Sequence, residues 1–151
     1  MSKNKPVILN FEDIEADFLH SQLLDMIDED RVIKFYDFGK GLEPAHRHPN
    51  GHGIIANTAT VEKSVYVAID CLVSGNSILR GNVSILNSSW IEDSVTIIGE
   101  GKGVILDDVS SLTENVSVSG SYTFKGAHIA GKHKFKNTGV RSIKHFKLFR
   151  L

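Results

Sequence analysis

The sequence has little of what usually marks a secreted, membrane-spanning or nucleic-acid-binding protein. Among its 151 residues there is one cysteine, Cys71, so no disulfide can form within the chain and a reducing, cytoplasmic setting is expected. The apolar run at residues 7–9 is too short for a secretory signal, and no stretch approaches the length of a membrane span. A net charge of −1 gives the whole molecule no electrostatic preference for nucleic acid or for an acidic membrane.

The charges are nevertheless distributed unevenly along the chain. Residues 12–30 contain eight acidic residues and no lysine or arginine, whereas no acidic residue follows Glu114. The cations of this last stretch are Lys125, Lys132, Lys134, Lys136, Arg141, Lys144, Lys147 and Arg150. Residues 132–151 therefore form a basic C-terminal tail. Its cations and interleaved aromatics would suit nucleic acid, but near-zero net charge favours a solvated tail or pairing with the acidic segment.

The most informative pattern is a six-residue repeat that begins at residue 55. The aliphatic residues that open its rows are Ile55, Val61, Val67, Val73, Leu79, Ile85, Ile91 and Ile97. A small or β-branched residue follows four positions later, and turn formers such as Gly75-Asn76 lie between. Because strand side chains alternate between faces, the fifth residue of one row and the first of the next point inward. The pattern predicts a β-solenoid with a narrow aliphatic bore.

The repeat slips by three residues near the glycines at 99, 101 and 103. The residues that lead the second frame are Leu106, Leu112, Val118, Phe124 and Ala130. In this frame His128 falls at an inward position and is expected to close the bore. The glycines are interpreted as a solenoid corner rather than a phosphate-binding loop, because no helix follows them. The slip is either a bulge in one solenoid or a boundary between two stacks.

Residues 54–131 resemble the hexapeptide-repeat family of left-handed parallel β-helix proteins. In that family three rows form one triangular coil, which implies about four coils stacked at ~4.8 Å. The left hand comes from the resemblance, since the general preference of parallel crossovers would favour a right-handed solenoid. The resemblance also implies a homo-oligomer, with a trimer favoured. This short chain without catalytic loops is similar to hexapeptide-repeat proteins that serve as building blocks, including ones carried by phages and other mobile elements. That similarity implies a role as an inhibitor or adaptor.

The segments outside the repeat are expected to cap it, because terminal coils leave open strand edges. Helical spacing of apolar residues predicts an amphipathic helix over 11–28, and alternation predicts a strand over 31–38. Residues 39–53 are expected to form a loop that leads into the first coil. Residues 1–53 are thus interpreted as an N-terminal capping or oligomerisation arm.

Three histidines, His46, His48 and His52, cluster in that predicted loop. They are candidates for a general base or a metal site, but no cysteine or carboxylate completes a standard ligand spacing. A solvated capping loop is therefore favoured and no metal is predicted. Enzymes of the resembled family are acyltransferases that use acetyl-CoA or another acyl-CoA and a histidine base. No long loop leaves the coils here to build an acceptor pocket, so no cofactor is expected and this activity is the alternative.

The outward positions carry apolar residues where an isolated solenoid would be polar. These residues are Tyr66, Leu72, Ile78, Leu86, Trp90 and Ile98. Contiguous apolar surface indicates an interface, and one helix cannot easily cover three faces. The sequence therefore favours a non-enzymatic β-helix scaffold that forms homo-oligomers and binds a protein partner, ahead of an acyltransferase and of a nucleic-acid binder.

Overall fold

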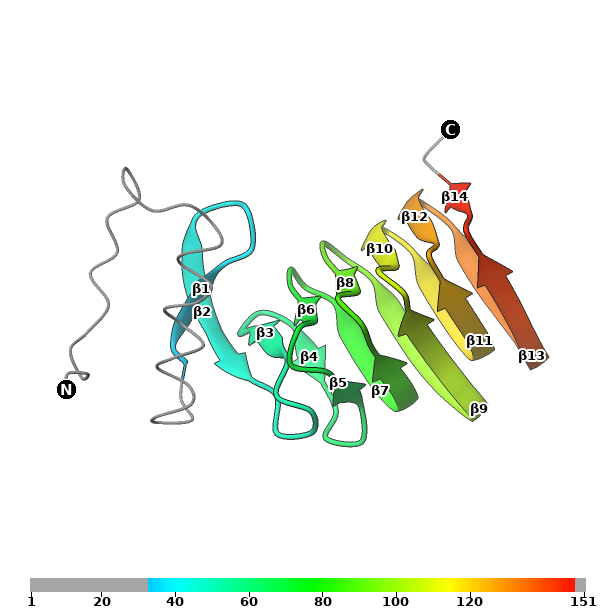
Figure 1. Ribbon diagram of the computed structural model, residues 1–151, viewed down its shortest axis with the longest axis horizontal. Coiled ribbons are helices and arrows are strands. Elements are labelled where there is room, and N and C mark those ends of the chain that lie inside the picture. The colour runs from blue at the N-terminus through cyan, green and yellow to red at the C-terminus, as the bar shows by residue number, and fades with distance from the viewer. Residues whose placement is uncertain (1–32, 149–151) are drawn as a thin grey trace.

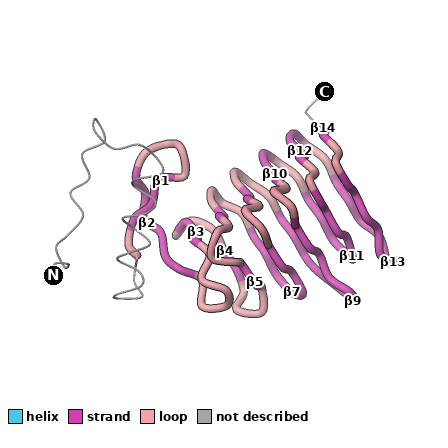
Figure 2. The backbone as a smooth tube through the Cα atoms, in the orientation of Figure 1, coloured by secondary structure: helices cyan, strands magenta, loops and turns pink. Residues whose placement is uncertain are grey.

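A computed structural model describes residues 33–148, which form a β-solenoid of about 5 turns with parallel strands (Figure 1). No residue in this range is helical, and the predicted β-helix is confirmed. The predicted helix at 11–28, the first two residues of the predicted strand at 31–38 and Arg150 lie outside the described residues. Figure 2 shows the strands stacked side by side along the length of the solenoid.

The described strands are mostly short, as expected for a chain that turns a corner every few residues. They are β1 (Phe35–Asp37), β2 (Leu42–Arg47), β3 (Ile54–Ala56), β4 (Thr60–Val61), β5 (Tyr66–Val67), β6 (Leu72–Val73), β7 (Ile78–Ile85), β8 (Trp90–Ile91), β9 (Thr96–Asp107), β10 (Ser111–Glu114), β11 (Ser117–Lys125), β12 (His128–Gly131), β13 (Lys134–Lys144) and β14 (Lys147–Leu148).

An antiparallel hairpin of β1 and β2 caps the N-terminal end of the solenoid (Figure 1). The predicted strand at 31–38 is thus found at Phe35–Asp37. The predicted loop at 39–53 instead contains β2, which pairs antiparallel with β3 over Arg47 and Ile54. This pairing covers the strand edge that the first coil would otherwise leave open.

Each coil contributes one segment to each of three faces. Face one is the sheet β3-β6-β8-β10-β12-β14, which continues the hairpin strands. Face two consists of β4 and the N-terminal halves of the long strands β7, β9, β11 and β13. Face three consists of β5 and the C-terminal halves of the same four long strands. In the first coils the spacing is uniform at three rows of the repeat, since Ile54 pairs with Leu72 and Leu72 with Trp90.

The bore is filled by the residues that lead the rows. Ile55, Val73 and Ile91 occupy it from face one and are fully buried. Further along, Tyr122 and Phe124 stack with their ring centroids 5.8 Å apart, and Phe135 packs edge-on against Phe124 at 5.7 Å. Burial of aliphatic and aromatic side chains is the main stabilising contribution to such a core. The alternation predicted from the repeat is therefore confirmed in the burial pattern.

The three-residue slip is a bulge within one continuous solenoid. Gly81 pairs with Gly99 at the regular spacing of three rows, whereas Val83 pairs with Val104 at a longer spacing. Residues 100–103 consequently stand opposite Asn82 alone and protrude at the corner between faces two and three. The carbonyl of Gly101 accepts a hydrogen bond from Asn82 Nδ2 at 3.1 Å, so the coil before the bulge holds it in place.

A second register change was not foreseen from the sequence. A spacing of three full rows would pair Ser111 with Ile129, but Ser111 pairs with His128. The difference arises because the turn at Gly126, between β11 and β12, is one residue shorter than the corresponding turn between β9 and β10. Ile129, not Ala130, is consequently buried, and the small inward position is taken by Ala127. The prediction that His128 points into the bore is wrong, since this residue lies on the outer surface of face one.

The basic segment predicted as a tail continues the β-helix. Strand β13 pairs parallel with β11, and β14 pairs parallel with β12. The described part of the segment, through Leu148, therefore forms one more coil than the repeat count indicated. This coil escaped the repeat pattern because its register changes again, from Ser119 pairing with Lys136 to Ser121 pairing with Val140.

Candidate functional site

Each face carries one of the predicted pairs of apolar outer residues. On face one, Leu72 and Trp90 are direct partners in adjacent parallel strands and both are half-buried. Partners in register project from the same side of a sheet, so their side chains are neighbours. Trp90 is the only tryptophan of the chain.

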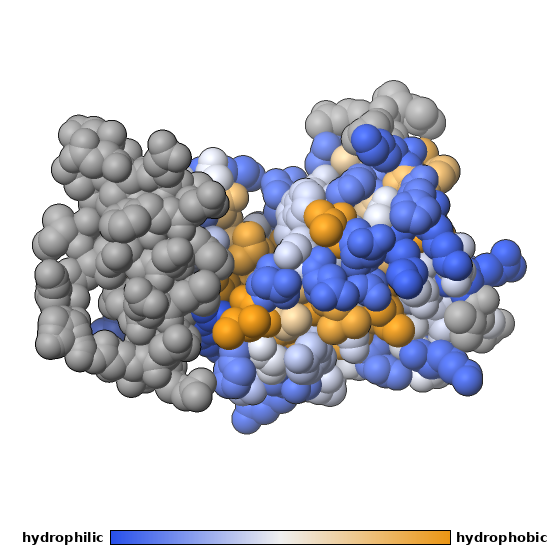
Figure 3. Space-filling view, viewed as in Figure 1, coloured by the Kyte–Doolittle hydropathy of each residue, from blue (hydrophilic) through white to orange (hydrophobic). Residues whose placement is uncertain are grey.

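The pairs on faces two and three are diagonal neighbours. Ile98 pairs with Arg80, two positions after Ile78 and on the same side of face two. Leu86 likewise lies two positions beyond Ser84, the partner of Tyr66 on face three. Side chains at such diagonal positions project from the same side of the sheet and are near neighbours. Hydrophobic side chains gather in the part of the surface nearest the hairpin and over the middle of the solenoid, bordered by hydrophilic ones (Figure 3).

Face one continues beyond Trp90 as an outer column of different chemistry. Ser111 pairs with Trp90, His128 pairs with Ser111, and Lys147 pairs with His128. Four successive coils thus place an indole, a hydroxyl, an imidazole and an ammonium on one line. Neither repeat frame of the sequence predicted this column, because both register changes must be known before these residues can be aligned.

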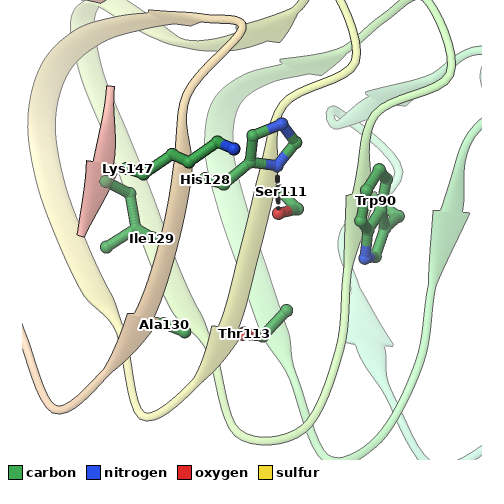
Figure 4. A pocket seen from close by; sticks show the side chains of 7 residues that line it. All are labelled: Trp90, Ser111, Thr113, His128, Ile129, Ala130 and Lys147. Atoms are coloured by element: carbon green, nitrogen blue, oxygen red, sulfur yellow. Dashed lines mark hydrogen bonds between the residues drawn. The ribbon is translucent and has the colours of Figure 1, made fainter. Parts of the chain in front are cut away.

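A hollow of about 430 Å³ lies along this column (Figure 4). The residues that line it are Trp90, Ser111, Thr113, His128, Ile129, Ala130 and Lys147. Ser111 Oγ and His128 Nδ1 are 2.8 Å apart and hydrogen-bonded. The indole of Trp90 lies with its ring centroid 5.7 Å from that of the His128 imidazole, at an interplanar angle of 45°. No carboxylate is among these lining residues.

The three candidate histidines of the N-terminal region have separate roles. His48 is 2% exposed, and its Nε2 is 2.7 Å from the Val65 carbonyl oxygen. Burial lowers the pKa of the His48 imidazole below its usual range, which suits a neutral, structural side chain. His46 is exposed and its Nδ1 is 2.7 Å from Asn57 Oδ1. Within residues 33–148, no group of three His, Cys, Asp or Glu side chains is placed to hold a metal ion.

His52 and Cys71 also have structural surroundings. His52 has a φ of 69° and its carbonyl oxygen accepts a hydrogen bond from the Arg47 guanidinium. Cys71 is fully buried, and this burial raises the pKa of its thiol to about 12. A thiol with so high a pKa is not a nucleophile at neutral pH.

The cations of the C-terminal region surround the last coil rather than lining one stripe. Lys134 and Lys136 lie on face two, Lys144 lies on face three and Lys147 lies on face one, all exposed. Lys132 is exposed at the corner between faces one and two. Among the described residues, β13 and β14 are the last strands of their sheets, and lysines on such strands disfavour pairing with another chain.

No protein-family model, curated protein or solved structure matches the chain. In the described residues, no helix has the length and apolar character needed to cross a membrane.

Proposed function

We propose that the protein is a non-enzymatic β-helix scaffold that self-associates side by side through faces two and three. The observation that carries the proposal is the pair of apolar side chains left on each of these neighbouring faces, Ile78 with Ile98 and Tyr66 with Leu86. Tyr66 is 40% exposed, and the other three are half-buried on the flat outer surface. Apolar residues that adjoin one another on an outer surface favour a protein interface.

Faces two and three carry different apolar pairs, and contact through both faces favours a ring over a two-fold dimer. A two-fold dimer uses one self-complementary patch, whereas each subunit of a ring contacts two neighbours through two different patches. A trimer, which the resemblance to hexapeptide-repeat proteins implies, is the smallest such ring. The predicted helix at 11–28 has one apolar stripe and would account for one face at most.

The charge of the last coil argues against stacking of two copies end to end. This end carries a second hollow of about 440 Å³, lined by Phe135, Ser142, Ile143, Lys144, Phe146 and Leu148. Two copies that met here would bring the lysines at 134, 136, 144 and 147 of each chain together. Like charges at such short range oppose association, so lateral contact through faces two and three is favoured.

The test is the mass of the full chain in solution, measured by sedimentation velocity over a wide range of protein concentration. The wild type is expected to sediment as an oligomer. The double variants Ile78→Lys/Ile98→Lys and Tyr66→Lys/Leu86→Lys are expected to shift it to monomer, because each places two charges in one patch. A wild type that is monomeric at the highest concentration would overturn the proposal.

A matched control separates loss of the interface from added charge. Ser119 pairs with Ile98 in the next coil, and Lys136 follows it in the same outer column, so lysine is compatible with this surface. The Ser119→Lys variant is therefore expected to keep the oligomer. If it dissociates as fully as Ile78→Lys/Ile98→Lys, net charge rather than the apolar pair governs association and the assignment of the interface fails.

The acyl-CoA-dependent alternative receives no support from the contacts of His46, His48 and His52. His48, the one that is buried, is held by a backbone carbonyl. Binding of nucleic acid by the basic coil is likewise not favoured, because its cations face several directions rather than one groove. Both remain predictions that calorimetric titration with acetyl-CoA and salt-dependent DNA retention would test.

A further inference from the structure

The hollow on face one has the composition of a ligand site rather than of a bare solenoid wall. On face two, for comparison, the outer column of Thr96, Ser117 and Lys134 carries polar groups without an aromatic ring. On face one Trp90, Ser111, His128 and Lys147 follow one another without interruption and border a space of about 430 Å³ (Figure 4). Spaces of this size fall within the range of small-molecule sites.

We propose that this hollow binds a small organic anion with a planar ring. The ring would lie against the Trp90 indole, and the carboxylate or phosphate would be bound by His128 and Lys147. This site is distinct from the proposed association surface, because it lies on face one rather than on faces two and three.

The charge of the lining sets the sign of the ligand. Lys147 supplies an ammonium, and no carboxylate among the lining residues neutralises it. No acidic residue follows Glu114 in the chain, so the coils that supply His128 and Lys147 have a positive local field. An anion in this hollow therefore meets attraction from the lysine and no repulsion from the lining.

The hydrogen bond from Ser111 would orient the His128 imidazole to bind the same anion. When the Ser111 hydroxyl donates its proton to His128 Nδ1, across 2.8 Å, the neutral ring carries its own proton on Nε2. That N–H is then available to donate to an anionic oxygen. Ser111 is 6% exposed, so its hydroxyl is oriented by the imidazole rather than by bulk water.

The apolar part of the lining selects a flat ring. Trp90 is half-buried and tilted by 45° to the imidazole, which leaves part of the indole facing the hollow. Ile129 and Ala130 are the apolar aliphatic residues among the lining. Aromatic rings stack on indole with a favourable energy beyond that of area burial. A ring without π-electrons would keep only the burial contribution.

Because Trp90 is the single tryptophan and lines the hollow, its fluorescence can report binding at this site. Intrinsic fluorescence of the full chain arises mainly from Trp90, so titration with benzoate, phenyl phosphate, cyclohexanecarboxylate and inorganic phosphate follows occupancy directly. Benzoate or phenyl phosphate is expected to give a saturable change, and whichever binds more tightly identifies the anionic group. Cyclohexanecarboxylate is expected to bind several-fold more weakly than benzoate. No saturable change with either aromatic anion would overturn the proposal.

Matched lysine variants test the role of the charge. Lys147→Gln removes the ammonium from the hollow, and affinity is expected to fall about tenfold or more, as for loss of a charge-assisted hydrogen bond. Lys144→Gln removes the same charge from face three of the same coil and is expected to change affinity less than about twofold. Equal weakening by both would mean that only the general positive field attracts the anion, and the site assignment would fail.

Two further variants test whether the imidazole takes part and whether one chain suffices to build the site. His128→Gln keeps a polar outer side chain and is expected to weaken binding about as much as Lys147→Gln, with an unchanged circular dichroism spectrum. Wild-type affinity in His128→Gln would remove the imidazole from the site. The Ile78→Lys/Ile98→Lys variant is expected to bind the anion as the wild type does. Loss of binding in this variant would show that the hollow is completed only by a neighbouring copy, which contradicts a site within one chain.

Discussion

The coils before the bulge and the coils after it share one backbone architecture but differ in register, core and surface. Before residue 98 the spacing is uniform, the bore is aliphatic, and the outer pairs are apolar. After residue 104 the register changes at each further coil, the bore contains Tyr122 and Phe124, and the outer surface carries serine, threonine and lysine. A solenoid tolerates these changes because each coil contacts only its neighbours. The proposed association surface can therefore lie mainly before the bulge, while the hollow combines Trp90 from that region with Ser111, His128 and Lys147 from the coils after it.

The aromatic core after the bulge gives the largest predicted effect on stability. Phe124 is fully buried between Tyr122 and Phe135, so Phe124→Ala removes a stacked ring and leaves a cavity. The free energy of unfolding is expected to fall by about 3–5 kcal/mol, measured by chemical denaturation. Thr123→Ala, its half-exposed neighbour, is the control and is expected to change it by less than about 0.5 kcal/mol. A loss below about 1 kcal/mol for Phe124→Ala would mean that this core is loosely packed.

The same contrast explains which parts of the fold could be predicted from the sequence. Where the six-residue period is strict, as from Ile55 to Ile97, alternation alone identifies the inward residues. The second frame, which begins after the bulge, also identifies them correctly through Phe124. The shortened turn at Gly126 leaves no mark in the hydrophobic pattern, because Ile129 and Ala130 are both apolar. Because of that ambiguity, the sequence analysis assigned His128 to the bore and did not predict the column that it forms with Ser111.

The corners supply the next largest effect and a direct comparison between the two regions. Gly75 has a φ of 75°, and a Cβ there would lie 2.3 Å from the Asp93 carbonyl oxygen of the next coil. Gly75→Ala is expected to destabilise by about 2 kcal/mol. Gly139, in the irregular last coil, has no atom within 4 Å of such a Cβ. Gly139→Ala is expected to change stability by less than about 0.5 kcal/mol. Thermal unfolding of both variants compares them, and equal losses would contradict the close coil contact at Gly75.

A pH dependence of stability is expected from the N-terminal cap. Because burial lowers the pKa of His48 in the folded chain, the unfolded chain binds the proton more readily. Stability is therefore complete above the ordinary histidine pKa of about 6.5 and falls below it, by at most about 1.4 kcal/mol per pH unit for this side chain. Denaturation at several pH values should show a smaller slope in His48→Gln than in the wild type. His52→Gln is the control, and an equal change of slope there would exclude His48 as the cause.

The smallest effect is expected at the bulge that separates the two regions. Asn82 is exposed, and its Nδ2 donates to the Gly101 carbonyl, so Asn82→Ala removes one hydrogen bond that is partly replaced by water. A loss of roughly 0.5–1 kcal/mol is expected. Asn76→Ala, at an exposed corner of an earlier coil, is the control. Amide hydrogen exchange is the sharper measurement, because faster exchange confined to residues 100–103 would show that Asn82 holds the bulge locally. If exchange instead accelerates throughout the coils on both sides, the bulge couples the two regions, and the association surface and the hollow are not independent.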